Sequence, residues 1–186
     1  FQALLTVHAF ARGRSEGSLQ GVLEALTDFS GNEEICSLGL ESILGASGAQ
    51  MQRHIRKIVE APAFSTTLRT IVDRFPLTAA NAMRLLTVIL VESPASRAEY
   101  MEATAEALFA LFEFPPEWHP ADWEVLLRAF DALCEERLGR DLLVQHELLG
   151  RLSEEWAKLL YSDDEASRTT VRKFKGGTER LLGVLR

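Results

Sequence analysis

Cysteine is scarce in this sequence, which argues against a fold held together by disulfides. The chain contains two cysteines, Cys36 and Cys134, and both lie inside apolar patterns of helical spacing. A thiol in such a position behaves as a small hydrophobic group. Because proteins of reducing compartments use cysteine in this way, we expect an intracellular protein, cytoplasmic or nuclear.

Long apolar runs are also missing. Uninterrupted apolar stretches such as 88–91 are far shorter than the ~20 residues needed to cross a bilayer. The formal net charge of −7 opposes attraction to nucleic-acid phosphates and to anionic lipid. We therefore expect no membrane partner, and the charge disfavours nucleic acid as a partner.

The sequence lacks the motifs that carry most enzyme chemistry. Its histidines lie on separate segments, and none has a second metal-ligand residue at the spacing of a zinc site. No glycine-rich phosphate loop and no serine nucleophile motif occurs, and glycine-containing runs fall where helices are expected to end. The sequence predicts a protein that is not an enzyme and that holds no cofactor and no metal.

Apolar residues at spacings of three and four are the dominant pattern. Hydrophobic residues make up 47% of the chain and charged residues 25%, as in folded globular proteins. The spacing predicts an all-α fold of about 9–11 helices, separated by Gly, Pro, Ser and Asn. The main expected helices are 1–12, 18–29, 33–44, 49–60, 64–75, 78–92, 98–101, 103–114, 121–137 and 142–161.

The stretch 78–114 organises the rest of the chain. The helix expected at 78–92 is apolar nearly all round, which is typical of a helix in the middle of an assembly. Ser93-Pro94 then breaks the chain before the helix expected at 103–114. Similar helix-break-helix blocks on both sides predict a stack of helical units with one shared core.

Three leucines occupy equivalent places in this stack. Leu44, Leu90 and Leu133 are spaced by 46 and 43 residues, each in an apolar helix followed by a shorter and then a longer helix. This periodicity resembles that of armadillo and HEAT repeats, whose units cover about 40 residues. The resemblance implies a right-handed superhelix in which 35–46, 78–92 and 121–137 are the third helices of their units.

The same resemblance divides the chain into one helical-repeat domain, 1–186. Its units are a partial first repeat at 1–31, repeats at 32–75, 76–114 and 115–162, and capping helices at 163–186. Since the sequence begins with Phe1, we expect a fragment of a longer protein. The asparagine ladder of peptide-binding armadillo proteins is absent, because Ala46, Glu92 and Glu135 stand where it is expected.

Two surfaces are candidates for binding a partner. The concave surface of the third helices is expected to carry Arg84, Glu92 and Glu135, with Glu136 beside them, and its acids favour a basic or amphipathic protein segment. The helix 49–60 places its basic residues on one face. That face is either a solvated surface or a site for an acidic segment or phosphate, and its residues are Arg53, Arg56 and Lys57.

Aromatic residues and prolines gather in the segment 114–123. Trp118 and Trp123 lie there, and rigid aromatic residues serve either as binding hot spots or as staples between helices. Charge is also uneven along the chain: 48–75 holds five basic residues and two acids, whereas 97–137 holds ten acids and three arginines. Such an asymmetry either steers a partner or keeps the domain soluble.

The sequence thus predicts a non-catalytic scaffold or adaptor that binds a protein segment on a helical-repeat surface. A first alternative is an assembly domain that associates with itself or docks within a larger complex, through Trp156 and the group of Phe109, Phe112 and Phe114. A weaker alternative is nucleic-acid binding through the basic C-terminal segment, which carries Arg168, Arg172, Lys173 and Lys175.

Overall fold

The structure, a computed structural model, describes residues 2–11, 17–113 and 120–161, together with positions 165, 168, 169 and 172. These residues form ten α-helices and two short 3-10 helices, and no strand occurs among them, so the all-α prediction is confirmed. The elements are α1 (Gln2–Ala11), α2 (Gly17–Asp28), α3 (Glu33–Leu44), α4 (Gly48–Glu60), α5 (Phe64–Arg74), η1 (Pro76–Thr78), α6 (Ala79–Glu92), η2 (Pro94–Ser96), α7 (Arg97–Glu113), α8 (Pro120–Glu135), α9 (Arg137–Gln145) and α10 (Leu148–Leu160).

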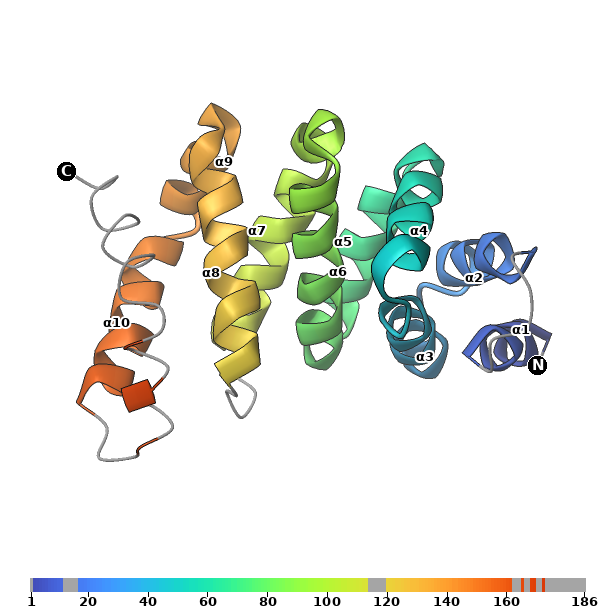
Figure 1. The fold of residues 1–186 in the computed structure, drawn as a ribbon, viewed down its shortest axis with the longest axis horizontal. Coiled ribbons are helices and arrows are strands. Elements are labelled where there is room, and N and C mark those ends of the chain that lie inside the picture. Colours follow the sequence, from blue (N-terminus) through green and yellow to red (C-terminus); the bar gives the residue numbers. More distant parts are fainter. Residues whose placement is uncertain are drawn as a thin grey trace.

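The helices follow one another along the long axis of the molecule, with α1 at one end and α10 at the other (Figure 1). They pack in two rows. The first row is α1, α3, α6 and α8, each in contact with the next, and the second row is α2, α5, α7 and α9. Helix α4 packs against α2, α3 and α6, while α10 packs against α7 and α9.

Contacts between α6 and α8 keep a constant offset along the sequence. Arg84 reaches Asp122 and the hydroxyl of Thr87 reaches the carbonyl of Val125, and both pairs are 38 residues apart. A constant offset means that the two helices run parallel and in register. Between α3 and α6, the amide of Asn81 donates to the carboxylate of Glu41 across 40 residues.

Helix α6 is the most completely surrounded element. It contacts α3, α4, α7 and α8, and its buried side chains lie on most of its circumference. This agrees with the apolar composition of 78–92, because a helix that is apolar all round must be covered on every side. Its buried residues are Ala79, Ala82, Met83, Leu85, Leu86, Thr87, Ile89 and Leu90.

Several helix boundaries follow the local chemistry expected of them. The side chain of Asn32 accepts a hydrogen bond from the backbone N–H of Ile35 at 3.1 Å and so caps the start of α3. Pro76 and Pro94 each begin a 3-10 turn that leads into α6 and α7, because proline is tolerated in a first turn. The expected break at Ser93-Pro94 is present.

Two boundaries differ from the prediction. The helices expected at 98–101 and 103–114 form the single helix α7, since Glu102 and Ala103 are good helix formers and neither breaks the chain. The helix expected at 142–161 is instead divided between α9 and α10. The break is at Glu147, whose φ of 53° lies in the left-handed region.

Gly139 was expected to end a helix but lies inside the first turn of α9. A Cβ built at this position would stand 2.2 Å from the carbonyl oxygen of Leu133, near the end of α8. No side chain fits that distance, and a backbone atom cannot rotate away. The glycine therefore allows the close approach of α9 to α8.

We expect Gly139→Ala to destabilise the protein by about 1–3 kcal/mol, the usual range for overpacking a tight contact. Urea unfolding followed by circular dichroism measures this change. Gly150→Ala is the matched control, because Gly150 is also helical but has no neighbouring atom within 4 Å of an added Cβ. The control should gain about 0.5–1 kcal/mol from helix propensity, and equal losses in both variants would contradict the role given to Gly139.

Candidate interaction surface

Helix α4 separates its residues into a buried face and a charged face. His54, Ile55 and Ile58 are buried against the neighbouring helices. Arg53, Arg56 and Lys57 are exposed on the other side, as the spacing of the sequence predicts, and we call these three residues the basic face. The buried hydroxyl of Tyr100 in α7 donates to the carbonyl of Ile58 at 3.3 Å and fixes α4 to the second row.

A cleft opens between α4 and the C-terminal end of α6. It has a volume of about 200 Å³ and is lined by Gln52, Ile55 and Arg56 of α4, by Glu92 of α6 and by Ser93. We call it the α4–α6 cleft. Within the described part of the chain, neither Arg56 nor Glu92 forms an ion pair, although the cleft presents both.

The other charged residues predicted on the third helices are held by neighbours. Arg84 pairs with Asp122 at 2.5 Å. Glu135 pairs with Arg97 at the start of α7, and Arg97 also donates to the carbonyl of Leu90 at 2.6 Å. Arg84 and Glu135 therefore contact charged partners within the fold, whereas Glu92 lines the α4–α6 cleft.

The remaining predicted residues lie in three different situations. Glu136 is exposed and precedes α9 as its N-cap residue, without a side-chain cap. Trp123 is 1% exposed and packs edge-on against Trp156 at 5.5 Å, so it joins α8 to α10 from inside the protein. Trp118 lies outside the described residues.

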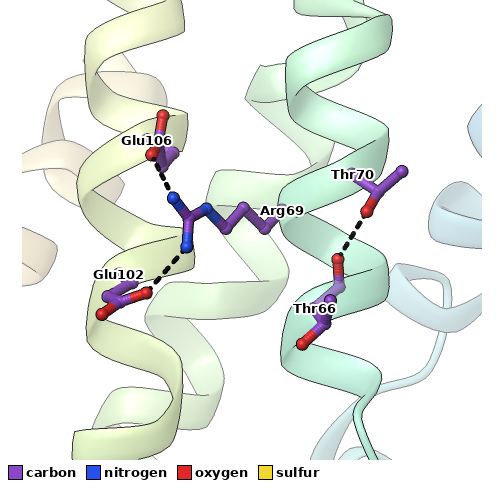
Figure 2. A network of polar contacts seen from close by, with 5 residues as sticks. All are labelled: Thr66, Arg69, Thr70, Glu102 and Glu106. Atoms are coloured by element: carbon purple, nitrogen blue, oxygen red, sulfur yellow. Dashed lines mark hydrogen bonds and ion pairs between the residues drawn. The ribbon is translucent and has the colours of Figure 1, made fainter.

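The uneven charge along the chain is partly paired within the fold. Figure 2 shows the guanidinium of Arg69 in α5 between two acids of α7, with Glu102 at 2.8 Å and Glu106 at 3.1 Å. Beside it, Thr70 donates to the backbone carbonyl of Thr66 at 2.9 Å. The basic sector 48–75 and the acidic sector 97–137 therefore meet between α5 and α7.

Gln52, Ser93, Asp122 and Arg97 were not predicted as site residues. Gln52 lies one helical turn before Arg56, so helical spacing alone places the two residues on the same face of α4. The positions of Asp122 and Arg97 depend on the register between rows, which no local pattern reports.

His54 is the buried titratable group beneath the basic face. Its ring lies 5.5 Å from that of Phe10 in α1, and its Nδ1 has no hydrogen-bond partner among the described residues. Burial lowers the pKa of His54, a hydrogen bond to the Ile43 backbone opposes this, and the charges of Lys57 and Arg53 lower it further. The neutral imidazole is therefore the form that the fold accommodates.

We expect the free energy of unfolding to decrease as the pH falls below about 6.5, the ordinary histidine value. Below it the unfolded chain takes up a proton that folded His54, with its lowered pKa, does not. Urea unfolding at pH 7.5, 6.5 and 5.5 measures this, and His54→Gln should remove part of the slope because glutamine does not ionise. Parallel pH profiles for the two proteins would exclude His54 as the cause.

The described residues offer no group of three or more His, Cys, Asp or Glu side chains arranged to hold a metal. Burial raises the pKa of Cys36 to about 11 and also raises that of Cys134, so both thiols stay protonated near neutral pH. No described helix combines the length and the apolarity that a membrane crossing requires.

Comparisons with protein-family models, with curated proteins and with solved structures found no match to this chain.

Proposed function

We propose that this protein is a non-catalytic scaffold or adaptor that binds a segment of a partner protein on the surface of a helical-repeat array. The array is an armadillo- or HEAT-like right-handed superhelix inside the cell. The constant offset supports this proposal, because contacts between neighbouring helices at separations of 38 to 40 residues are expected when a unit of about 40 residues repeats.

The observation that carries the binding proposal is the α4–α6 cleft beside the basic face. Elsewhere in the described part of the chain, arginine–carboxylate ion pairs join α5 to α7, α6 to α8, α7 to α8, and α7 to α10. In the cleft Arg56 and Glu92 are presented to solvent without an ion pair among the described residues. Exposed charged side chains that form no ion pair within the fold are available to bind a partner.

Self-association is the alternative, but the aromatic residues from which the sequence predicts it give it little support. Trp156 is buried, and Phe109 and Phe112 pack against the core, while Phe114 lies outside the described residues. The exposed large apolar side chains lie elsewhere on separate elements, among them Leu77 at 80%, Val144 at 70% and Tyr161 at 86% exposed. Light scattering from micromolar to millimolar concentration separates the two proposals, because a strict monomer excludes self-association.

Nucleic-acid binding has less support in the described residues. Glu165 lies 3.1 Å from Arg168 and 3.9 Å from Arg172, so it offsets charge in the segment predicted to be basic. Lys173 and Lys175 lie outside the described residues.

We expect the double charge reversal Arg56→Glu/Lys57→Glu to reduce retention of specific partners about fivefold or more. Both side chains are exposed on the basic face, and reversal replaces attraction by repulsion. Quantitative mass spectrometry after affinity capture with the tagged protein, wild type against variant, measures the loss.

The matched control is Arg128→Glu/Arg137→Glu, which changes the net charge equally at exposed positions on α8 and α9. It should leave retention within about twofold, since neither residue lines the cleft. Equal loss in both variants would mean that overall charge, and not this surface, governs binding. Unchanged retention in both would remove the basic face from the proposal.

A further inference from the structure

We propose that the α4–α6 cleft binds a mixed-charge peptide segment, with an acidic side chain on Arg56 and a basic side chain on Glu92. This inference rests on the proposed function and gives the chemistry of the partner at one site. It differs from the basic or amphipathic segment expected for the third helices, where Glu135 and Asp122 pair with arginines of this chain.

A second arginine and glutamate in this chain, Arg97 and Glu135, occupy comparable positions and do form an ion pair. Glu92 and Glu135 each stand two residues after a repeat leucine, Leu90 or Leu133. Arg97 precedes Glu135 by 38 residues and forms an ion pair with it. Arg56 precedes Glu92 by 36 residues, yet the two side chains line a cleft without meeting.

The two walls of the cleft have opposite signs. Glu92 lies at the C-terminal end of α6, where the helix dipole is negative, so this wall favours a cation. On the opposite wall the exposed guanidinium of Arg56 favours a carboxylate. A ligand of a single charge would satisfy one wall and be repelled by the other.

The size and lining of the cleft fit an extended segment. A volume of about 200 Å³ corresponds to roughly six or seven water molecules, which side chains of a ligand would displace. The lining is mainly polar, with Ile55 almost fully buried, and the amide of Gln52 can both donate to and accept from a peptide backbone.

The spacing between the two charged residues of the ligand follows from the geometry of an extended peptide. In an extended peptide, side chains two residues apart point to the same side, roughly 6.5–7 Å along the chain. An acidic residue and a basic residue separated by one position would therefore enter the cleft together. An amphipathic helix would need more surface than this cleft offers.

The test uses two blocked heptapeptides in a Gly-Ser background. The first carries Glu at its third position and Lys at its fifth, and the second carries Gln at both. Titration of the ¹⁵N-labelled protein should give saturable shifts at the amides of Gln52, Arg56 and Glu92 with the charged peptide. The Gln peptide should bind about three- to tenfold more weakly, the range for charge-assisted contacts at a solvated site.

Two matched double variants locate the effect. Arg56→Gln/Glu92→Gln removes one cation and one anion from the cleft, whereas Arg137→Gln/Asp141→Asn removes one of each from exposed positions of α9 outside it. We expect the first to weaken the charged peptide about three- to tenfold and the second to change it less than twofold. All four side chains are exposed, so both variants should keep the thermal midpoint of the wild type.

Three results would overturn the inference. They are equal binding of the two peptides, equal weakening by the two variants, and no saturable shift with the wild type at about 10 mM peptide, a concentration at which even a contact of −4 kcal/mol is detected. The capture experiment keeps the two proposals apart. If reversal of the basic face releases partners while the peptides fail, the scaffold function stands and only the mixed-charge ligand is wrong.

Discussion

Burial of α6 is the constraint on which the rest of the structure depends. This helix is apolar on almost its whole circumference, so it needs neighbours on every side, and α3, α4, α7 and α8 supply them. Beside the enclosed α6, α8 lies in a register that pairs Arg84 with Asp122 and Thr87 with Val125. The two rows are the consequence of covering one helix, repeated along the chain.

The register decides which charges are left on the surface. Each exposed ion pair contributes about 0–1 kcal/mol to stability, so the pairs matter little to the fold as a whole. They matter more to binding, because Arg69, Arg84 and Arg97 each occupy acids that composition alone assigns to an open acidic sector. Net charge therefore describes this protein less well than individual exposed charges do, such as Arg56 and Glu92, which form no ion pair among the described residues.

The sequence predicts the helical class, the central helix and the proline breaks, because periodicity and proline act locally. It does not predict the break at Glu147, since no glycine or proline marks the left-handed residue. It assigns Gly139 to a helix end, although that glycine is needed for contact with a carbonyl of another helix. Likewise the basic face of α4 follows from helical spacing, whereas its position opposite Glu92 depends on tertiary packing that spacing does not encode.

Arg97, which pairs with Glu135, and Arg56, which lines the cleft with Glu92, lie in different local settings. After α6, the turn η2 leads directly into α7, so Arg97 starts a helix beside the end of α6 and reaches both the Leu90 carbonyl and Glu135. Before α6, the chain breaks between α4 and α5, where Ala63 has a φ of 58°. Helix α4 is thereby separate from α5, and Arg56 lies near its middle with its side chain beside a cleft. Among the described residues, Arg56 and Glu92 therefore line the cleft without an ion pair, whereas Arg97 and Glu135 form one.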